Sequence, residues 1–368
     1  MFRLYKPSPI VPAGFYAKLH GTFRGLTRWQ VLDERGVPEI PRNPSGVPIG
    51  PVEGVENPNL ITDLFLDRVA GSTYLMDPNA NLINGQPPMR RHLAVGTGST
   101  APNVADTTLD SEAQRAATSA GFGDGSQTYA YVSADELFRC TSIVTRVVQM
   151  TANRNLTEYG FAPNTSGDIV IRELFRDGIG NPVTISLLNG KSIRLDHTLF
   201  IELPAPDADT APIIQVDIEE YDAANTLVDT FTYDAWFRFQ SASTSSATIR
   251  RLYEMWTPGL STFTRAIFRL TAAPLNAPIT GNANTFWPAT DGFTATIPAY
   301  VNGSYERIRR YTTTTAQWNA ALPGFTMRSS GGPSDVGGLT LAFDDPATYT
   351  KASTDTLRVG FVSTWSRA

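Results

Sequence analysis

The sequence predicts an all-β protein: an antiparallel β-sandwich or jelly roll with one or two short helices and an extended N-terminal arm. Short segments rich in Val, Ile, Thr and Phe recur along the chain, and turns separate them. The turns draw on 29 glycines and 26 prolines, while few stretches show the spacing of a helix. This combination is typical of packed β-layers, and 41% hydrophobic content over 368 residues is enough for one large core or two ordinary ones.

We expect the first 55 residues to form the extended arm. Proline removes a backbone donor and excludes helix and central strand, so a dense run of it favours an extended or polyproline-like chain. Such an arm can reach a neighbouring subunit, or it can pack as a linker on its own domain. Residues 15–23 before it could form a strand. The prolines are Pro38, Pro41, Pro44, Pro48, Pro51 and Pro58, alternating with Gly36, Gly46, Gly50 and Gly54.

Two helices are predicted after the arm. Asn57 is a suitable N-cap and Pro58 a suitable first helical residue. Apolar residues follow at helical spacing, and their face should close one end of the β-core. A second helix of one or two turns is expected at 108–115, where Thr or Asp precedes good helix formers. The apolar residues of the first helix are Leu60, Ile61, Leu64, Phe65 and Val69.

Almost all remaining elements are predicted strands. Asn189 and Gly190 favour a tight hairpin turn, because both tolerate positive φ angles. In the strand after this turn, His197 shares one face with apolar neighbours, so one face is predicted to be core and the other wet. The apolar neighbours are Ile193, Leu195, Leu199 and Ile201. The predicted strands are 139–150, 168–176, 183–188, 192–203, 213–221, 227–240, 263–271, 293–300, 305–314, 338–343 and 356–364.

The expected organisation has three parts. Residues 1–55 are the arm, 56–204 the β-sandwich core with its N-terminal helix, and 205–368 further β-strands. The proline-rich run 204–212 resembles a linker. We favour one elaborated sandwich, in which the third part is a long insertion and the C-terminal strands return to the first sheet.

Composition and charge disfavour several classes of protein. The formal net charge is −5 and the charges are scattered, so the basic stripe that nucleic-acid binding requires is missing. No window approaches the 18 or so apolar residues of a membrane span, and the N-terminus lacks the apolar region of a secretory signal. We therefore expect folding in the cytoplasm and no membrane insertion. Only four of the 30 basic residues are lysine, a bias that suits arginine-rich interfaces or simply reflects a GC-rich genome.

No catalytic, metal or cofactor site is predicted. His20, His92 and His197 lie far apart and lack ligand spacing, and Cys140 in a strand is expected to be buried and inert. His92 follows two arginines, a cluster that meets a neighbour's carboxylate or lies on a solvated turn. The glycine-rich stretch 96–102 lacks the lysine and helix of a phosphate loop, so a bend is expected there. Paired carboxylates at 219–220 and 344–345 point to opposite strand faces, which disfavours glycosidase chemistry.

Surface recognition is the remaining kind of site. Tyrosine and tryptophan concentrate in the second half, where they either anchor interfaces and sugars or belong to the core. Two stretches combine them with arginine, a composition favoured at the centre of interfaces. The interface candidates are Arg250, Arg251, Tyr253, Trp256, Tyr305, Arg309, Arg310 and Tyr311.

The order of several short motifs resembles a family of tailed-bacteriophage virion proteins. The resemblance is clearest over residues 59–203 and weaker near the C-terminus, while the N-terminal arm and the middle of the chain are unmatched. Members of this family are commonly assigned to tail fibres, baseplates or other capsid-attached parts. The motifs are NLITD at 59–63, LAVGTGSTAP at 93–102, LTEYGF at 156–161, ELFRD at 173–177 and NPVTI at 181–185, with LTLAFDDP at 339–346 and TLRVGFVSTWSR at 356–367.

The resemblance implies assembly or host contact, not catalysis. We expect a non-enzymatic subunit of a homo-oligomeric tail or tail-fibre assembly in the virion, with the N-terminal arm docking to the particle or to a sister subunit. One alternative is a head decoration or head-fibre protein, which position in the particle would reveal. Another is a receptor- or glycan-binding module, which binding to host envelope would reveal. An enzyme would release reducing ends from host polysaccharide, and their absence would exclude this alternative.

Overall fold

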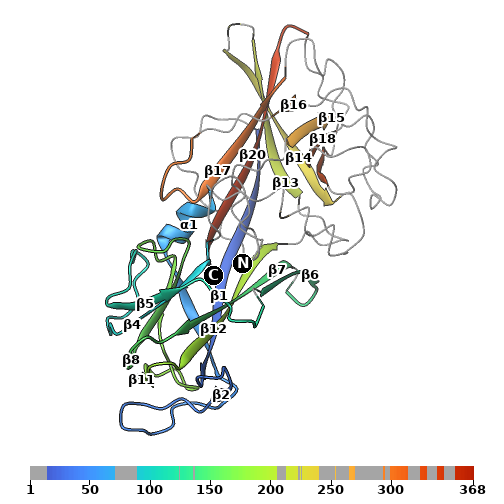
Figure 1. Cartoon of the computed structure of the whole chain (residues 1–368). Helices are drawn as coiled ribbons and strands as arrows, with labels where there is room; N and C mark the ends of the chain where they lie inside the picture. The colour runs from blue at the N-terminus through green and yellow to red at the C-terminus, as the bar shows by residue number, and fades with distance from the viewer. Residues whose placement is uncertain are drawn as a thin grey trace.

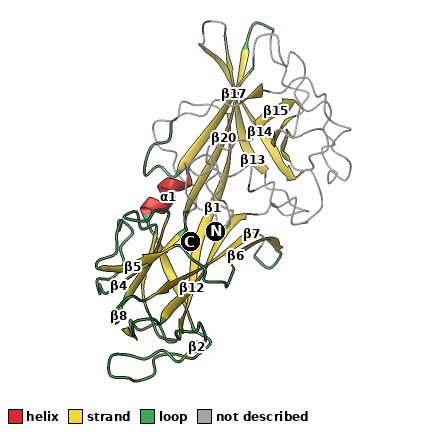
Figure 2. Cartoon of the chain, viewed as in Figure 1, coloured by secondary structure: helices red, strands yellow, loops and turns green. Residues whose placement is uncertain are grey.

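The computed structural model describes residues 15–70, 89–123, 125–135, 137–204, 213–222, 224, 226–239, 253, 265–269, 293–294, 299–313, 324–329, 338–343 and 353–368. Within these ranges the chain is mostly β-strand, with one helix (Figure 2). The predicted all-β fold is therefore confirmed. Nearly all strand pairs are antiparallel. Eighteen of the described strands join into one curled sheet, and β8 and β11 form a separate two-stranded sheet.

The first part of the chain forms a sandwich of two layers (Figure 1). One layer has the order β6–β7–β12–β1, and β3 continues the sheet into a second layer with the order β3–β10–β9–β4–β5. A short pair, β8 with β11, lies at one end. The strands are β1 (Phe15–Leu32), β2 (Pro38–Glu39), β3 (Val55–Ile61), β4 (His92–Gly96), β5 (Glu112–Ala116), β6 (Gly125–Val132), β7 (Leu137–Gln149), β8 (Arg154–Leu156), β9 (Glu158–Ala162), β10 (Ile171–Leu174), β11 (Ile185–Leu187) and β12 (Ser192–Pro204).

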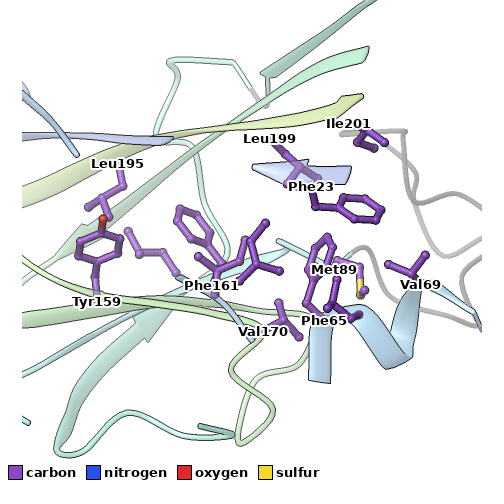
Figure 3. Close-up of a cluster of buried hydrophobic side chains, with 14 of the residues drawn as sticks. Phe23, Phe65, Val69, Met89, Tyr159, Phe161, Val170, Leu195, Leu199 and Ile201 are labelled. Carbon is purple, nitrogen blue, oxygen red and sulfur yellow. The ribbon is translucent and has the colours of Figure 1, made fainter. Parts of the chain in front are cut away.

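The core lies between the two layers (Figure 3). Leu195, Leu199 and Ile201 of β12 face Tyr159 and Phe161 of β9, and all five are fully buried. The face predicted for 192–203 is therefore the one that points inward, His197 included. Burying apolar side chains from two sheets is what holds a β-sandwich together, at about 1.5–3 kcal/mol for each large side chain.

Strand β1 is long and pairs with strands from both parts of the chain. Its 18 residues span about 60 Å at the usual rise of about 3.3 Å per residue. Residues 22–32 pair with β12 on one side. On the other side, residues 15–23 pair in parallel with the C-terminal strand β20 and residues 25–29 pair with β3.

The second part of the chain extends the sheet from β20. Strands β17 and β13 both pair with β20, and β13 leads through β14, β19 and β18 to β15 and β16. The C-terminal strand therefore lies in the same sheet as β1. These strands are β13 (Ile213–Tyr221), β14 (Leu227–Phe239), β15 (Arg265–Arg269), β16 (Phe293–Thr294), β17 (Glu306–Thr312), β18 (Gly324–Ser329), β19 (Gly338–Phe343) and β20 (Thr356–Arg367).

The prediction of an extended N-terminal arm is wrong for the described part of this segment. Residues 15–32 are one strand, whose first part pairs with β20 and whose residues 22–32 pair with β12. Residues 33–54 fold back as a structured loop, so residues 22–55 belong to the sandwich. The alternation of Phe23, Trp29 and Val31 with polar residues buries one face of β1, and that burial outweighs the proline signal beyond it. Residues 1–14 and the expected linker at 205–212 lie outside the described residues.

The helix prediction was right in existence and wrong in its start. Helix α1 (Asp63–Val69) begins after Thr62, whose hydroxyl accepts a hydrogen bond from the Phe65 amide at 3.3 Å. Asn57 and Pro58 are instead in β3, where pairing with β1 fixes an extended backbone. Tertiary pairing here overrides a local start signal. Phe65 and Val69 pack into the core, as predicted.

Two further predictions are corrected. The segment expected as a second helix, 108–115, overlaps strand β5, which pairs with β4. The turn at Asn189 and Gly190 exists, with Gly190 at φ +87°, but the strands beside it are not partners. β11 pairs with β8 in the separate two-stranded sheet, whereas β12 pairs with β7 and β1 in the large sheet.

Candidate interaction surface

Three tight turns lie together at the end of the sandwich farthest from β13–β20, where β2 is labelled (Figure 1). In the loop 33–54, the Asp33 carboxylate accepts hydrogen bonds from the amides of Arg35 and Val37, both at 2.8 Å. The Asn43 side chain accepts from the amides of Ser45 and Val47 at 3.0 and 2.9 Å. Each turn closes with a glycine at positive φ, which only glycine adopts without strain.

A third turn of the same kind follows β10. The Asp177 carboxylate accepts from the amides of Ile179 and Asn181 at 3.0 and 2.9 Å. Hydrogen bonds to a carboxylate stabilise its charged form, and they lower the pKa of Asp33, chiefly through Val37, and of Asp177, chiefly through Asn181. Near neutral pH, the carboxylates of Asp33 and Asp177 and the side-chain amide of Asn43 therefore hold the three turns closed.

Apolar side chains project from these turns and from the loops beside them. Ile179 is 86% exposed, more than any other large apolar side chain among the described residues. We define the apolar end as the six exposed apolar residues of this region: Val37, Ile40, Val47, Val52, Ile179 and Leu188. Single exposed apolar residues are ordinary, whereas a group at one end of a molecule is typical of a contact surface.

The loops of the apolar end are tied to one another and to the core. The Ser186 amide donates to the Arg42 carbonyl at 2.9 Å, and Lys191 forms an ion pair with Glu39. The Trp29 indole donates to the Arg176 carbonyl at 3.1 Å, which fixes the third turn on the buried end of β1. The apolar end is therefore held in place before any partner arrives.

Carboxylates already occupy the place beside the glycine-rich loop after β4 where a phosphate loop would bind its phosphate. Glu158 is fully buried and accepts hydrogen bonds from the amides of Gly98 at 3.0 Å and Ser111 at 2.7 Å. Its second oxygen lies 2.9 Å from Arg172 Nη2, and Arg172 also pairs with Asp106. An incoming phosphate would meet two negative side chains, so this arrangement supports a bend and not a nucleotide site.

A second buried polar cluster surrounds His197. Arg90 Nη1 lies 2.8 Å from His197 Nδ1, and Arg90 also donates to the carbonyl and hydroxyl of Ser142 at 3.0 and 2.6 Å. Burial, then Arg90, holds the pKa of His197 well below its ordinary value; burial lowers the pKa of Arg90 to about 9. His197 is thus a neutral core residue that accepts a hydrogen bond from Arg90.

The prediction of a solvated basic cluster at the start of β4 is corrected for two of its residues. Arg90, Arg91 and His92 were expected on a solvated turn or against a neighbour's carboxylate. Arg91 is exposed, but Arg90 and His92 are buried within the chain. Arg90 finds its acceptors inside the sandwich, on β7 and β12. Cys140 is also fully buried, and burial raises the pKa of its thiol to about 12. An undissociated thiol of this kind is a poor nucleophile.

The predicted interface residues do not form one surface. Tyr253 is fully buried, and its hydroxyl binds the backbone of Phe138, Cys140 and Ile201, while Tyr311 is 2% exposed. The prediction that these two tyrosines are contact residues is corrected, because their rings fill the core. Arg309 and Arg310 lie on β17 and pair in register with β20. Arg250, Arg251 and Trp256 lie outside the described residues.

Tyr305 belongs to a joint between the two parts of the chain. Its hydroxyl donates to Asp63 at 2.9 Å, and Asp63 also pairs with Arg367 of β20. Asp67 accepts from the Tyr300 hydroxyl at 2.8 Å and the Gly303 amide at 2.7 Å, and the Trp365 indole donates to the Leu66 carbonyl at 2.7 Å. Helix α1 thus anchors β20 and the segment before β17 to the sandwich.

The apolar end was missed by the sequence analysis, although a signal for it exists. Asp33 and Asn43 each stand three residues before a glycine and four before a valine, a pattern that repeats after ten residues. Asp or Asn followed by glycine at this spacing favours a closed turn with an exposed tip. The density of proline around it suggested an unstructured arm instead.

In the described part of the chain, no group of three or more His, Cys, Asp or Glu side chains is arranged to hold a metal ion. No helix there has the length and apolar character needed to cross a membrane. The carboxylates at 219–220 lie on β13, and those at 344–345 fall outside the described ranges.

Comparisons with protein-family models, with curated proteins and with solved structures found no match.

Proposed function

We propose that this chain is a non-enzymatic structural subunit of a tailed phage particle, in the tail or tail fibre, made in the host cytoplasm and carried in the virion. The observation that carries the proposal is the apolar end: six exposed apolar side chains on turns that are already fixed by hydrogen bonds. A surface of this kind binds another folded protein through apolar contact.

Preorganisation favours such a contact. Association loses the entropy of any loop that must become ordered, so pinned turns bind at a lower cost than mobile ones. Charged residues of both signs lie around the apolar tips, among them Glu34, Arg35, Glu39 and Arg42. An apolar centre within a mixed polar rim is the usual anatomy of a protein interface.

Four of the seven motifs that resemble the phage family converge in the fold, which further supports the proposal. Thr157 of the third motif donates its amide to the Gly96 carbonyl of the second at 2.9 Å. Phe175 of the fourth donates to the Thr157 carbonyl at 2.9 Å, and Val183 of the fifth donates to the Phe175 carbonyl at 2.8 Å. These four motifs thus specify one structural unit, as expected for residues whose role is architecture.

Two other functions follow from the same fold. A head decoration or head-fibre protein would use the apolar end against the capsid, and only position in the particle separates it from a tail subunit. A receptor- or glycan-binding module would use the aromatic second half, whose tryptophans at 236, 256, 287 and 318 have no described side chains. Its test is binding to purified host envelope.

The test is incorporation into particles. A phage lacking the gene is complemented with the wild-type chain or with the triple variant Val37→Ser, Val47→Ser, Ile179→Ser, and the particles are purified and labelled with gold-conjugated antibody. We expect the wild-type chain at the tail and loss of most label in the variant, because three apolar contacts are removed.

A matched control carries Leu227→Ser, Val228→Ser and Val301→Ser, three exposed apolar residues outside the apolar end. This control should be incorporated like the wild type. Equal label in both triple variants would exclude the apolar end as the docking surface. Label on the head would favour the decoration protein, and no label on any particle would overturn the virion assignment.

A further inference from the structure

Strand β6 lies at an edge of the sandwich. It pairs with β7 along its whole length, from Gly125 opposite Val144 to Val132 opposite Leu137. In the described part of the chain no second strand pairs with its other side. A strand held on one side presents a straight row of backbone donors and acceptors on the other.

The sequence of β6 contains none of the usual protection of an edge. Monomeric proteins place lysine, other charges or proline on edge strands to prevent pairing with a second chain. β6 reads GSQTYAYV, eight residues without a charge or a proline. Its outward side chains are the small residues Ser126, Thr128 and Ala130, all exposed, so a neighbouring strand can approach closely.

We infer that β6 pairs antiparallel with β6 of a second copy of this chain, joining two sandwiches into one continuous sheet. An antiparallel strand meets itself about a two-fold axis, which gives a closed dimer. Only registers that keep outward residues opposite outward residues retain the core face. The two registers centred on the strand place Thr128 opposite the partner's Thr128 or the partner's Ala130.

Self-pairing also explains why the absence of charge matters. In a two-fold pair the residue at the axis meets its own copy, so a charge at the centre of β6 would face a like charge. An uncharged strand is the self-complementary solution. The inward side chains Tyr129 and Tyr131 are half-buried at the rim of the core, and a partner strand would cover more of their surface.

The test uses opposite charges at one outward position. Thr128→Lys and Thr128→Glu each place like charges across the two-fold axis, so each variant alone should dissociate at least about tenfold more readily than the wild type. An equimolar mixture of the two should recover the dimer, because lysine then faces glutamate. Mass is measured by light scattering at several concentrations, against 40.0 kDa for one chain.

Thr198→Lys is the matched control. Thr198 lies on the same outward face but on the interior strand β12, so this variant should dimerise like the wild type. A wild-type chain that stays monomeric at every concentration would overturn the inference, and so would a dimer that Thr128→Lys leaves unchanged. Neither result bears on incorporation into particles through the apolar end, so the two proposals fail separately.

Discussion

Glu158 and Arg172 form a buried ion pair beneath the loop between β4 and β5, with 2.9 Å between Oε2 and Nη2 and almost no exposed surface on either side chain. The pair joins β9 to β10, and through the amides of Gly98 and Ser111 it also fixes both ends of the loop between β4 and β5. Three segments that are distant in sequence therefore depend on one carboxylate.

Replacing that carboxylate should destabilise the fold. In Glu158→Gln the new amide nitrogen faces donors of Arg172 and of the Asp110 backbone, and Arg172 keeps only Asp106 as a charged partner. Breaking a buried pair from one side costs about 3–5 kcal/mol, and Asp106 reduces this, so we expect a loss of about 3 kcal/mol. Urea denaturation measures it.

Asp135→Asn is the control for this substitution. Asp135 is exposed and lies 3.4 Å from Arg139, so its loss should change the free energy of unfolding by less than about 1 kcal/mol. Equal effects of the two substitutions would mean that Glu158 does not organise the loop.

Stability should fall as the pH decreases below about 6.5, the ordinary pKa of histidine. Burial and Arg90 lower the pKa of His197 in the folded chain, so the unfolded chain binds the proton first. Its contribution is complete above the unfolded pKa and is lost as the pH falls, by up to about 1.4 kcal/mol per pH unit. Burial also lowers the pKa of His92, which acts in the same direction.

His197→Gln isolates this contribution, because glutamine can still accept from Arg90 but does not titrate. Unfolding free energies at several pH values between 7.5 and about 5 should show a shallower slope than the wild type. Parallel curves would contradict a buried neutral His197.

Asp67 should control the joint between the sandwich and the second part of the chain. Asp67→Ala removes the acceptor of the Tyr300 hydroxyl and the Gly303 amide, which costs about 1–3 kcal/mol locally. Hydrogen exchange followed by mass spectrometry should show faster exchange over residues 299–313.

Arg68→Ala provides the matched comparison, since Arg68 is on the same helix but pairs with Asp168 of the sandwich. Exchange over 299–313 should stay at the wild-type rate in this variant. Identical protection in Asp67→Ala and the wild type would show that α1 does not hold the joint.

Thr62 is expected to set the start of α1. Its hydroxyl accepts from the Phe65 amide and donates to the Val170 carbonyl at 3.1 Å, so Thr62→Ala should lower the free energy of unfolding by about 1–2 kcal/mol. Thr62→Ser keeps both hydrogen bonds and should cost less. Similar losses in thermal unfolding for Ala and Ser would exclude the cap as the cause.

The fold class followed from the sequence because alternation is a local property. The inward face of β12 and the buried face of α1 were both visible in the spacing of apolar residues. Which strands pair was not visible: the turn at Asn189 was correct, yet β11 and β12 have different partners. Non-local pairing also converted Asn57 and Pro58 from a helix start into part of β3.

The candidate surface was less accessible to sequence reasoning. Aromatic and arginine content drew attention to Tyr253 and Tyr311, but the same rings that anchor interfaces also fill cores, and composition does not separate the two. The apolar end depends on Val37, Val47 and Ile179 being held outward by turns, which is a matter of backbone geometry.

The most direct test of the structural role is the amount of this chain in intact particles. The particles are purified on a gradient, protein outside them is digested with protease, and the chain is measured by quantitative mass spectrometry. A structural subunit should be present in a fixed ratio to the major capsid protein from one preparation to the next. A chain that is absent from the particles, or whose ratio varies with the purification, would contradict the assignment.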